Sequence, residues 1–185
     1  MKSVIIFGSK YGSARKYAMT LSEKLNLDVY DYSKITMDEE YDLILYVGSL
    51  YAGGVLGLKQ FLKRTNGCNL KKMFIITVGI SDPNNIKNIR NIENNVYKQL
   101  PKNLDKEVEL FHVRGKLDYS QLSLKHKIMM KLLYHHAKKI PFEKQDEETR
   151  LFISTYNKKV DFIDLNSLEI IIDRYVKIKN LMEIE

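Results

Sequence analysis

The hydrophobic positions of the chain fall into short continuous runs that alternate with stretches of helical spacing. Residues 2–7 form the first run, which is apolar and β-branched, as expected of a strand buried on both faces of a parallel sheet. After Gly8 the spacing changes, and from Ser13 onward apolar residues recur on one face of a helix. The members of that face are Ala14, Tyr17, Ala18, Leu21 and Leu25. The chain is therefore predicted to open with a strand, a tight loop and a helix.

The same alternation continues through the first 113 residues. Further strands are predicted over residues 27–32, 43–47, 73–78 and 108–113. Helical spacing between them is shown by Val55, Leu58, Phe61 and Leu62, and again by Ile86, Ile89, Ile92, Val96 and Leu100. Asp82, followed by Pro83, is the predicted N-cap of the second of these helices. Alternating strands and helices predict an α/β fold, a parallel sheet with helices on both faces.

A long segment, residues 114–160, separates the fifth strand from the last predicted helix. Loops of α/β units usually have about 2–6 residues, so this segment is expected to form an insertion within a single domain of residues 1–185. It contains an approximate helical stripe of Leu122, Ile128, Met129, Leu132, Leu133, His136 and Ile140. The closing helix is predicted to begin with a capping box of Asn166 and Glu169. Its apolar stripe consists of Leu168, Ile171, Ile172, Tyr175 and Ile178.

Positive charge is concentrated in the insertion. The chain has a net charge of +7, and residues 116–140 hold six lysines and one aspartate, a net charge of +5. Lys125, Lys127 and Lys131 are therefore candidates for a surface that attracts a carboxylate-bearing substrate or anionic lipid. The alternative is a solvated helix face with no binding role. The basic segment matches no nucleic-acid reader motif, so nucleic acid is not an expected partner.

The remaining composition narrows the class of protein further. There is no run of about 18 apolar residues that could span a bilayer, and Val4 to Phe7 is shorter than the roughly 7–15 apolar residues of a signal peptide. We expect a cytoplasmic location, with peripheral contact at the inner membrane face as an extension of the lipid hypothesis. Cys68 is the sole cysteine, which excludes an intramolecular disulfide. The four histidines lack metal-ligand spacing, so structural or surface roles and no metal are expected.

The loop after the first strand has the chemistry of a phosphate site. It comprises Ser9, Lys10, Tyr11, Gly12, Ser13 and Ala14. Hydroxyls, a glycine and backbone N–H groups stand here just before a helix N-terminus, whose partial positive charge favours an anion. The loop matches neither the P-loop pattern G-x-x-x-x-G-K-[ST] nor the dinucleotide pattern G-x-G-x-x-G.

Two more loops are predicted to meet the first at the carboxyl edge of the sheet, where ligands bind in open parallel sheets. The second comprises Ser49, Leu50, Tyr51, Ala52, Gly53 and Gly54, and the third comprises Gly79, Ile80, Ser81 and Asp82. Small residues let the backbone approach a flat ring, and Tyr51 could stack on it. The three loops together predict a site for a phosphate-bearing aromatic cofactor.

These loops resemble those of the flavodoxins, whose phosphate loop reads approximately [TS]-x-[TS]-G-x-[TS]. Tyr11 and Ala14 depart from that pattern, so two hydroxyl donors are missing. The chain looks most similar to the flavodoxin-like protoporphyrinogen oxidases, through Arg15-Lys16, the loop of residues 49–53 leading to Phe61, and the basic insertion. The resemblance implies a doubly wound five-stranded sheet of order 2-1-3-4-5 and FMN as the cofactor. It also implies an oxidoreductase that passes electrons from a small substrate to a quinone or other acceptor.

Two other functions remain open on the sequence. An electron carrier that docks on a redox partner protein would share the fold, although flavodoxins are characteristically acidic and this chain is basic. A flavin-free interaction module would fit if the phosphate site had decayed at Tyr11 and Ala14. A phosphorelay receiver is excluded, because Gly8-Ser9 and Ser49 stand where that class needs an acidic pair and a phosphorylatable aspartate.

Overall fold

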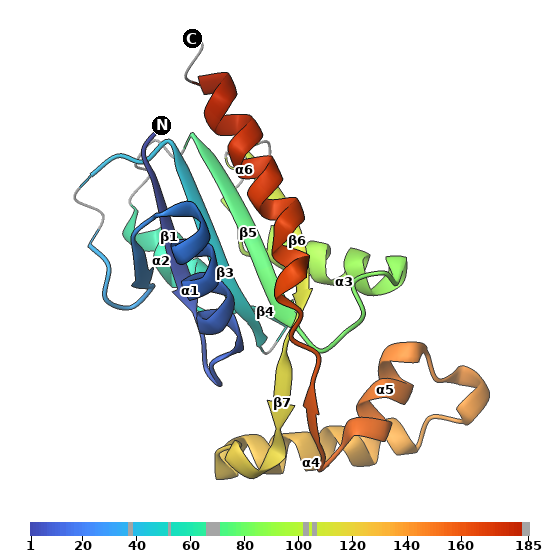
Figure 1. The fold of residues 1–185 in the computed structure, drawn as a ribbon. Helices are drawn as coiled ribbons and strands as arrows, with labels where there is room; N and C mark the ends of the chain where they lie inside the picture. Colours follow the sequence, from blue (N-terminus) through green and yellow to red (C-terminus); the bar gives the residue numbers. More distant parts are fainter. Residues whose placement is uncertain (37–38, 52, 66–70, 102–103, 105–106, 183–185) are drawn as a thin grey trace.

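The computed structural model describes residues 1–36, 39–51, 53–65, 71–101, 104 and 107–182. Its central sheet contains five parallel strands that lie side by side in the order β2-β1-β3-β5-β6 (Figure 1). Because β5 and β6 are the fourth and fifth predicted strands, this confirms the predicted order 2-1-3-4-5. Its strands are β1 (Ser3–Gly8), β2 (Val29–Asp31), β3 (Leu43–Tyr51), β5 (Lys72–Gly79) and β6 (Val108–Arg114). The short β4 (Gly54–Val55) folds back antiparallel onto the end of β3.

Helices cover both faces of this sheet. α1 (Ser13–Leu25) and α6 (Glu169–Met182) pack on one face, and α2 (Leu58–Arg64) and α3 (Ile86–Tyr97) on the other. Along β1, Ile5 enters the first core while Val4 and Ile6 enter the second, and all three are fully buried. This two-sided burial explains why the strands read as continuous apolar runs, and it confirms the α/β fold with helices on both faces.

The N-terminal cap of α3 differs from the prediction. Asn85, not Asp82, is the cap, and its Oδ1 accepts hydrogen bonds from the N–H groups of Lys87 at 3.0 Å and Asn88 at 3.2 Å. Asp82 instead accepts from the N–H of Asn84 at 2.9 Å, one turn earlier. The Asp-Pro pair therefore forms a turn before the helix, and the predicted cap was wrong by three residues.

The start of α6 also differs. The side chain of Asp164 accepts from the N–H of Asn166 at 3.0 Å and opens a 3₁₀ turn, η3 (Leu165–Leu168), that leads directly into α6. The predicted capping box of Asn166 and Glu169 was therefore wrong, because Asn166 already lies inside the helical turn as a donor. The strand predicted over residues 27–32 is also shorter, since only Val29–Asp31 pairs with β1.

The insertion forms a separate layer at the carboxyl end of the sheet (Figure 1). Two strands, β7 (Lys116–Asp118) and β8 (Lys159–Asp161), pair antiparallel and carry two helices. These helices are α4 (Leu124–Lys138), which confirms the predicted helical stretch, and α5 (Glu147–Thr155), which the sequence analysis missed. Single 3₁₀ turns, η1 (Tyr119–Gln121) and η2 (Phe142–Lys144), flank α4. None of the helices in the described part of the chain is both long and apolar enough to cross a membrane.

His112 on β6 is a titratable group buried beneath α3. Its Nδ1 lies 2.7 Å from the Thr77 hydroxyl, and its Nε2 lies 3.8 Å from a carboxylate oxygen of Glu93. Burial lowers the pKa of His112, while the nearby Glu93 carboxylate partly opposes that shift. The folded protein therefore favours the neutral imidazole.

This burial predicts a loss of stability in mildly acidic solution. Because the pKa of His112 is lower in the folded chain, its contribution is complete above the unfolded value of about 6.5 and is lost as the pH falls from there through the folded value. Between about pH 7.5 and about pH 5.5, urea unfolding should show a falling free energy of unfolding, with a smaller decrease in His112→Asn. His136→Asn, at an exposed position of α4, is the control. An equal decrease in His112→Asn and the parent protein would contradict this account.

Candidate functional site

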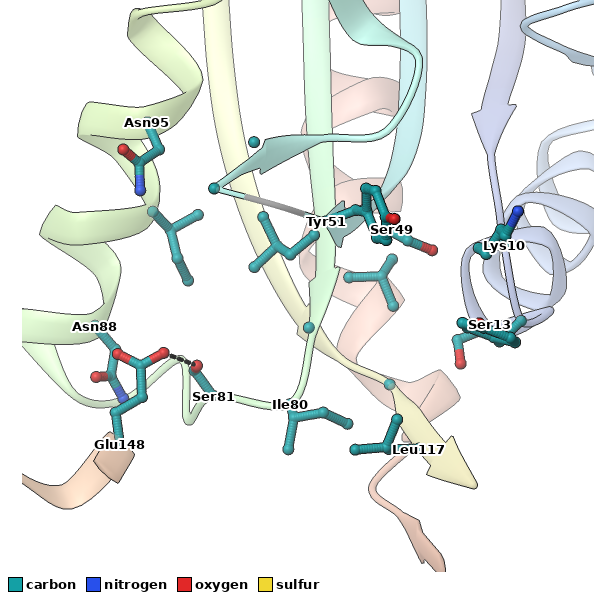
Figure 2. Close-up of a pocket in the computed structure, with 18 of the residues that line it drawn as sticks. Lys10, Ser13, Ser49, Tyr51, Ile80, Ser81, Asn88, Asn95, Leu117 and Glu148 are labelled. Atoms are coloured by element: carbon teal, nitrogen blue, oxygen red, sulfur yellow. Dashed lines mark hydrogen bonds between the residues drawn. The ribbon is translucent and has the colours of Figure 1, made fainter. Parts of the chain in front are cut away.

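A cavity of about 760 Å³ lies at the carboxyl end of the sheet, where the three predicted loops meet (Figure 2). The loop residues that line it are Lys10, Tyr11, Ser13, Ser49, Leu50, Tyr51, Gly53, Gly54, Gly79, Ile80 and Ser81. The volume falls within the range of about 300–1,000 Å³ that is usual for small-molecule and cofactor sites. The structure thus brings most of the predicted site residues to one cavity.

The remaining predicted residues lie elsewhere. Ser9 and Gly12 line a smaller neighbouring hollow of about 320 Å³, whose other lining residues are Phe7, Lys10, Arg15, Asp31 and Lys34. Ala14 is fully buried in the core, and Asp82 is not part of the cavity wall. Ala52 is outside the described residues, as is Cys68.

The first loop can hold an anion through its backbone. Gly12 is the N-cap of α1 with a φ of 92°, a conformation that favours glycine, and no side chain caps the helix. Its own N–H donates to the Ser9 hydroxyl at 3.1 Å. The N–H groups of the first turn of α1 therefore meet no capping side chain at the positive end of the helix dipole. Together with the cationic side chains of Lys10 and Arg15, this donor set fits a phosphate group.

The second and third loops approach each other closely. A Cβ at Gly79 would lie 2.7 Å from Leu50 Cδ1, so a larger residue there would push the loops apart. The turn between β3 and β4 is braced by Gln99, whose Oε1 accepts from the N–H of Val55 at 2.7 Å. A Cβ at Gly54 would lie 2.7 Å from Nε2 of the same Gln99 side chain. Glycines at these positions therefore let the Leu50 and Gln99 side chains pack directly against the backbone of the second and third loops.

Two walls of the cavity were missed by the sequence analysis. One is the face of α3, which contributes Asn88, Asn91, Ile92, Asn94, Asn95 and Lys98. The helical spacing of Asn88, Asn91 and Asn95, directly after the third loop, is a signal that could have found it. The other wall belongs to the insertion, which contributes Gly115, Lys116, Leu117, Leu122, His126, Met129, Met130, Leu133 and Glu148. Placing those residues requires the long-range path of the chain.

α5 meets the body of the protein next to this cavity. Its N-cap, Asp146, pairs with Lys87 of α3 at 3.0 Å, and Glu148 accepts from the Ser81 hydroxyl at 2.9 Å (Figure 2). Hydrogen bonds from the Thr149 hydroxyl and N–H, with Lys87 nearby, lower the pKa of Asp146 to about 2. The cap of α5 is therefore charged at all ordinary pH values.

α4 presents two different faces. Met129, Met130 and Leu133 line the cavity, although Met129 and Leu133 remain 37% and 49% exposed. Ile128 and Leu132, predicted on the same stripe, do not line it and are 53% and 67% exposed. The predicted helical stripe is therefore divided between the cavity wall and an exposed face of α4. Lys125, Lys127 and Lys131 are exposed and do not line the cavity, so the structure does not bring them to the site.

A single histidine joins α4 to two of the loops. His126 is buried, its Nε2 lies 2.6 Å from the Tyr51 hydroxyl, and its Nδ1 is hydrogen bonded to the Tyr11 hydroxyl. The sequence analysis expected only a structural or surface role for this residue. The structure places it in the cavity wall.

The fold and the site define the class as a doubly wound α/β protein with a cavity at the carboxyl end of its sheet. A model of the flavodoxin domain matches residues 4–143, and the chain belongs to this family. The match confirms the predicted flavodoxin resemblance and supports FMN as the cofactor, while the protoporphyrinogen oxidase branch is a finer assignment that it does not reach.

Two individual proteins are also similar. The chain is 31% identical over 83 residues to the uncharacterized protein MJ0298 of Methanocaldococcus jannaschii, a match that covers 43% of this chain and 55% of the relative. The matched region therefore spans about half the length of that protein. A flavoprotein from Lactobacillus acidophilus, crystallised in complex with FMN, is 13% identical with a TM-score of 0.43, covering 61% of this chain and 91% of that chain.

Proposed function

We propose that this protein is an FMN-dependent oxidoreductase that acts on a small substrate between the cofactor and the insertion. One observation carries the proposal: a single cavity is walled by the three cofactor loops on one side and by α3, α4 and α5 on the other. Family membership supports an FMN-binding redox protein. The part that the insertion takes in walling the cavity supports the finer assignment to an enzyme.

The loops have separate roles in this proposal. Ser9, Gly12 and the first turn of α1 would hold the phosphate, with Lys10 and Arg15 supplying positive charge. The loops at 49–54 and 79–81 would enclose the ring system with backbone groups. When bound, FMN supplies the electron-transfer chemistry, so the chain need only orient both molecules and exclude water.

The insertion favours an enzyme over an electron carrier. A carrier has to present its cofactor edge to a partner protein, whereas here Met129, Met130 and Leu133 form an apolar wall of the cavity. Protoporphyrinogen is the first substrate to test, with a quinone as acceptor, because the predicted resemblance is to the protoporphyrinogen oxidases. Since Lys125, Lys127 and Lys131 lie outside the cavity, Lys98 and Lys116 are the wall cations that could meet substrate carboxylates.

Binding of FMN can be tested at the phosphate end. The protein should quench FMN fluorescence on titration and should bind FMN at least about tenfold more tightly than riboflavin, because hydrogen bonds to a charged group contribute about 1.5–3 kcal/mol. Gly12→Ala should reduce this preference, since alanine is strained at a φ of 92°. Gly53→Ala, with a φ of 79° and equally open surroundings, is the matched control and should keep the preference. Absence of saturable FMN binding to the parent protein would overturn the proposal.

The substrate role of the insertion can be tested by filling the cavity from α4. Met130→Trp should lower turnover of protoporphyrinogen with a menaquinone analogue by about tenfold or more, because the larger ring would take up substrate space. FMN binding, measured by fluorescence, should persist. Lys131→Trp, one residue along on an exposed position, should turn over like the parent protein. An electron carrier would be favoured if neither the parent protein nor the two variants turned over the substrate, and if a flavodoxin reductase reduced the bound FMN of Met130→Trp and Lys131→Trp at equal rates.

A second property is proposed for the outer face of α4. Leu124, Ile128 and Leu132 recur every four residues and are 74%, 53% and 67% exposed. Lys125, Lys127 and Lys131 are interspersed among them on the same helix and are also exposed. An exposed apolar stripe with adjacent lysines suits an anionic lipid surface, where leucines enter the headgroup boundary and lysines pair with phosphates. We therefore propose peripheral binding through α4 to anionic membranes.

Vesicle sedimentation tests this proposal. The parent protein should bind vesicles containing phosphatidylglycerol more strongly than pure phosphatidylcholine vesicles, and added salt should weaken the binding. Ile128→Glu with Leu132→Glu should lower the partition coefficient by about tenfold or more, because each apolar side chain contributes about 1.5–3 kcal/mol when buried. Leu181→Glu replaces an exposed leucine on α6 and is the matched control. Equal binding of the double variant and the control would refute the role of α4.

A further inference from the structure

The buried His126 side chain contacts the half-buried side chains of Tyr11 and Tyr51. These residues come from α4, the first loop and the end of β3, so three segments far apart in sequence meet at one imidazole ring. His126 is only 6% exposed, and both of its ring nitrogens have a tyrosine hydroxyl as partner. The centroid of the His126 ring lies 5.7 Å from that of the Tyr11 ring and 5.2 Å from that of the Tyr51 ring.

The chemistry of the three groups makes this contact self-consistent. A neutral imidazole has one N–H donor and one acceptor nitrogen, while each tyrosine hydroxyl can both donate and accept. One tyrosine therefore donates to the ring and the other accepts from it, and either tautomer satisfies both nitrogens. The ring cannot turn about its bond to Cβ without losing two hydrogen bonds in a buried position, so its orientation is fixed.

The polar attachments of α5 to the body of the protein are more exposed. Lys87 and Asp146 have side chains that are 67% and 40% exposed, and ion pairs of this kind contribute little to stability. At the base of the insertion, Gly115 donates to the Gly79 carbonyl and Lys116 donates to the Ser13 hydroxyl. The paired strands β7 and β8 thus form a stem, and His126 is a buried anchor that holds α4 against the cofactor loops.

We propose that His126 is a positioning residue that holds α4 closed over the cavity, and that Tyr11 serves this contact instead of binding phosphate. This explains why a tyrosine stands where the flavodoxin pattern has serine or threonine, because its hydroxyl is engaged with α4. The same contact fixes the Tyr51 side chain in the wall of the cavity. The consequence for FMN retention rests on the proposed function, whereas the closure of α4 does not.

Loss of the imidazole should open the insertion. In His126→Ala both tyrosine hydroxyls lose their partner, which should shift the balance between closed and open forms by about tenfold or more. In the cofactor-free protein, backbone amides of α4 should then exchange with deuterium faster by a similar factor, while amides of β3 and β5 stay protected. In the FMN-loaded protein the release rate of FMN, followed by recovery of its fluorescence on dilution, should rise about tenfold.

Two comparisons separate positioning from a general loss of stability. His126→Gln keeps a side-chain amide that can reach a tyrosine hydroxyl, and it should restore part of the slow exchange and slow release. His136→Ala removes an exposed histidine from the same helix and should leave both rates unchanged. The visible circular dichroism of bound FMN should change in Tyr51→Phe and His126→Ala but not in His136→Ala, because only the first two free the Tyr51 ring.

The outcomes are distinct. Unchanged exchange of α4 in His126→Ala overturns the inference, whatever happens to FMN. If the parent protein does not bind FMN, the proposed function fails, yet the exchange measurement still decides whether His126 closes α4. Should His126→Ala not fold, Tyr11→Phe and Tyr51→Phe each remove one hydroxyl, and parent-like exchange in both would equally overturn the inference.

Discussion

The site depends on a close backbone approach at the ends of β1 and β3. A Cβ at Gly8 would lie 2.1 Å from the Leu56 carbonyl oxygen, and one at Gly48 would lie 2.1 Å from a methyl group of Val55. The segment containing β4 therefore lies directly across the carboxyl-terminal parts of the neighbouring strands β1 and β3. The Tyr46 hydroxyl donates to the Leu56 carbonyl oxygen at 2.7 Å and holds this segment in place. Because this crossing leaves no room for side chains, the first and second loops are held side by side. The cavity wall that these two loops form depends on that arrangement.

The sequence was sufficient to locate the central strands β1, β3 and β5 because they are buried on both faces of the sheet. The apolar run of β1 supplies Ile5 to one core and Ile6 to the other, so no alternation was needed to locate it. The positions of the three loops then followed from the rule that parallel strands end at one edge. Helix caps were less certain, since Asp82 and Asn85 have the same capping chemistry and only the path of the turn chooses between them.

The insertion was the part that sequence could not place. β7 and β8 have three residues each and lie about forty residues apart, so their pairing leaves no local pattern. In α4 the neighbours Ile128 and Met129 belong to different faces, one exposed and one lining the cavity. Helical periodicity gives the spacing of apolar residues but not which of two apolar faces meets the protein. The burial of His126 likewise depends on Tyr11 and Tyr51, which reach it only in the folded chain.

The insertion leaves and rejoins the body at almost the same point. Its first and last backbone groups meet where the N–H of Phe162 donates to the Gly115 carbonyl at 3.1 Å, and the Arg114 guanidinium lies 3.8 Å from the centre of the Phe162 ring. The path of the chain through the sheet is thus independent of what lies between these residues. Insertions and deletions between these residues can therefore lengthen, shorten or reshape the insertion while the strands of the sheet keep their order. What such changes must keep, if α4 is to stay against the first two loops, is the contact of His126 with Tyr11 and Tyr51.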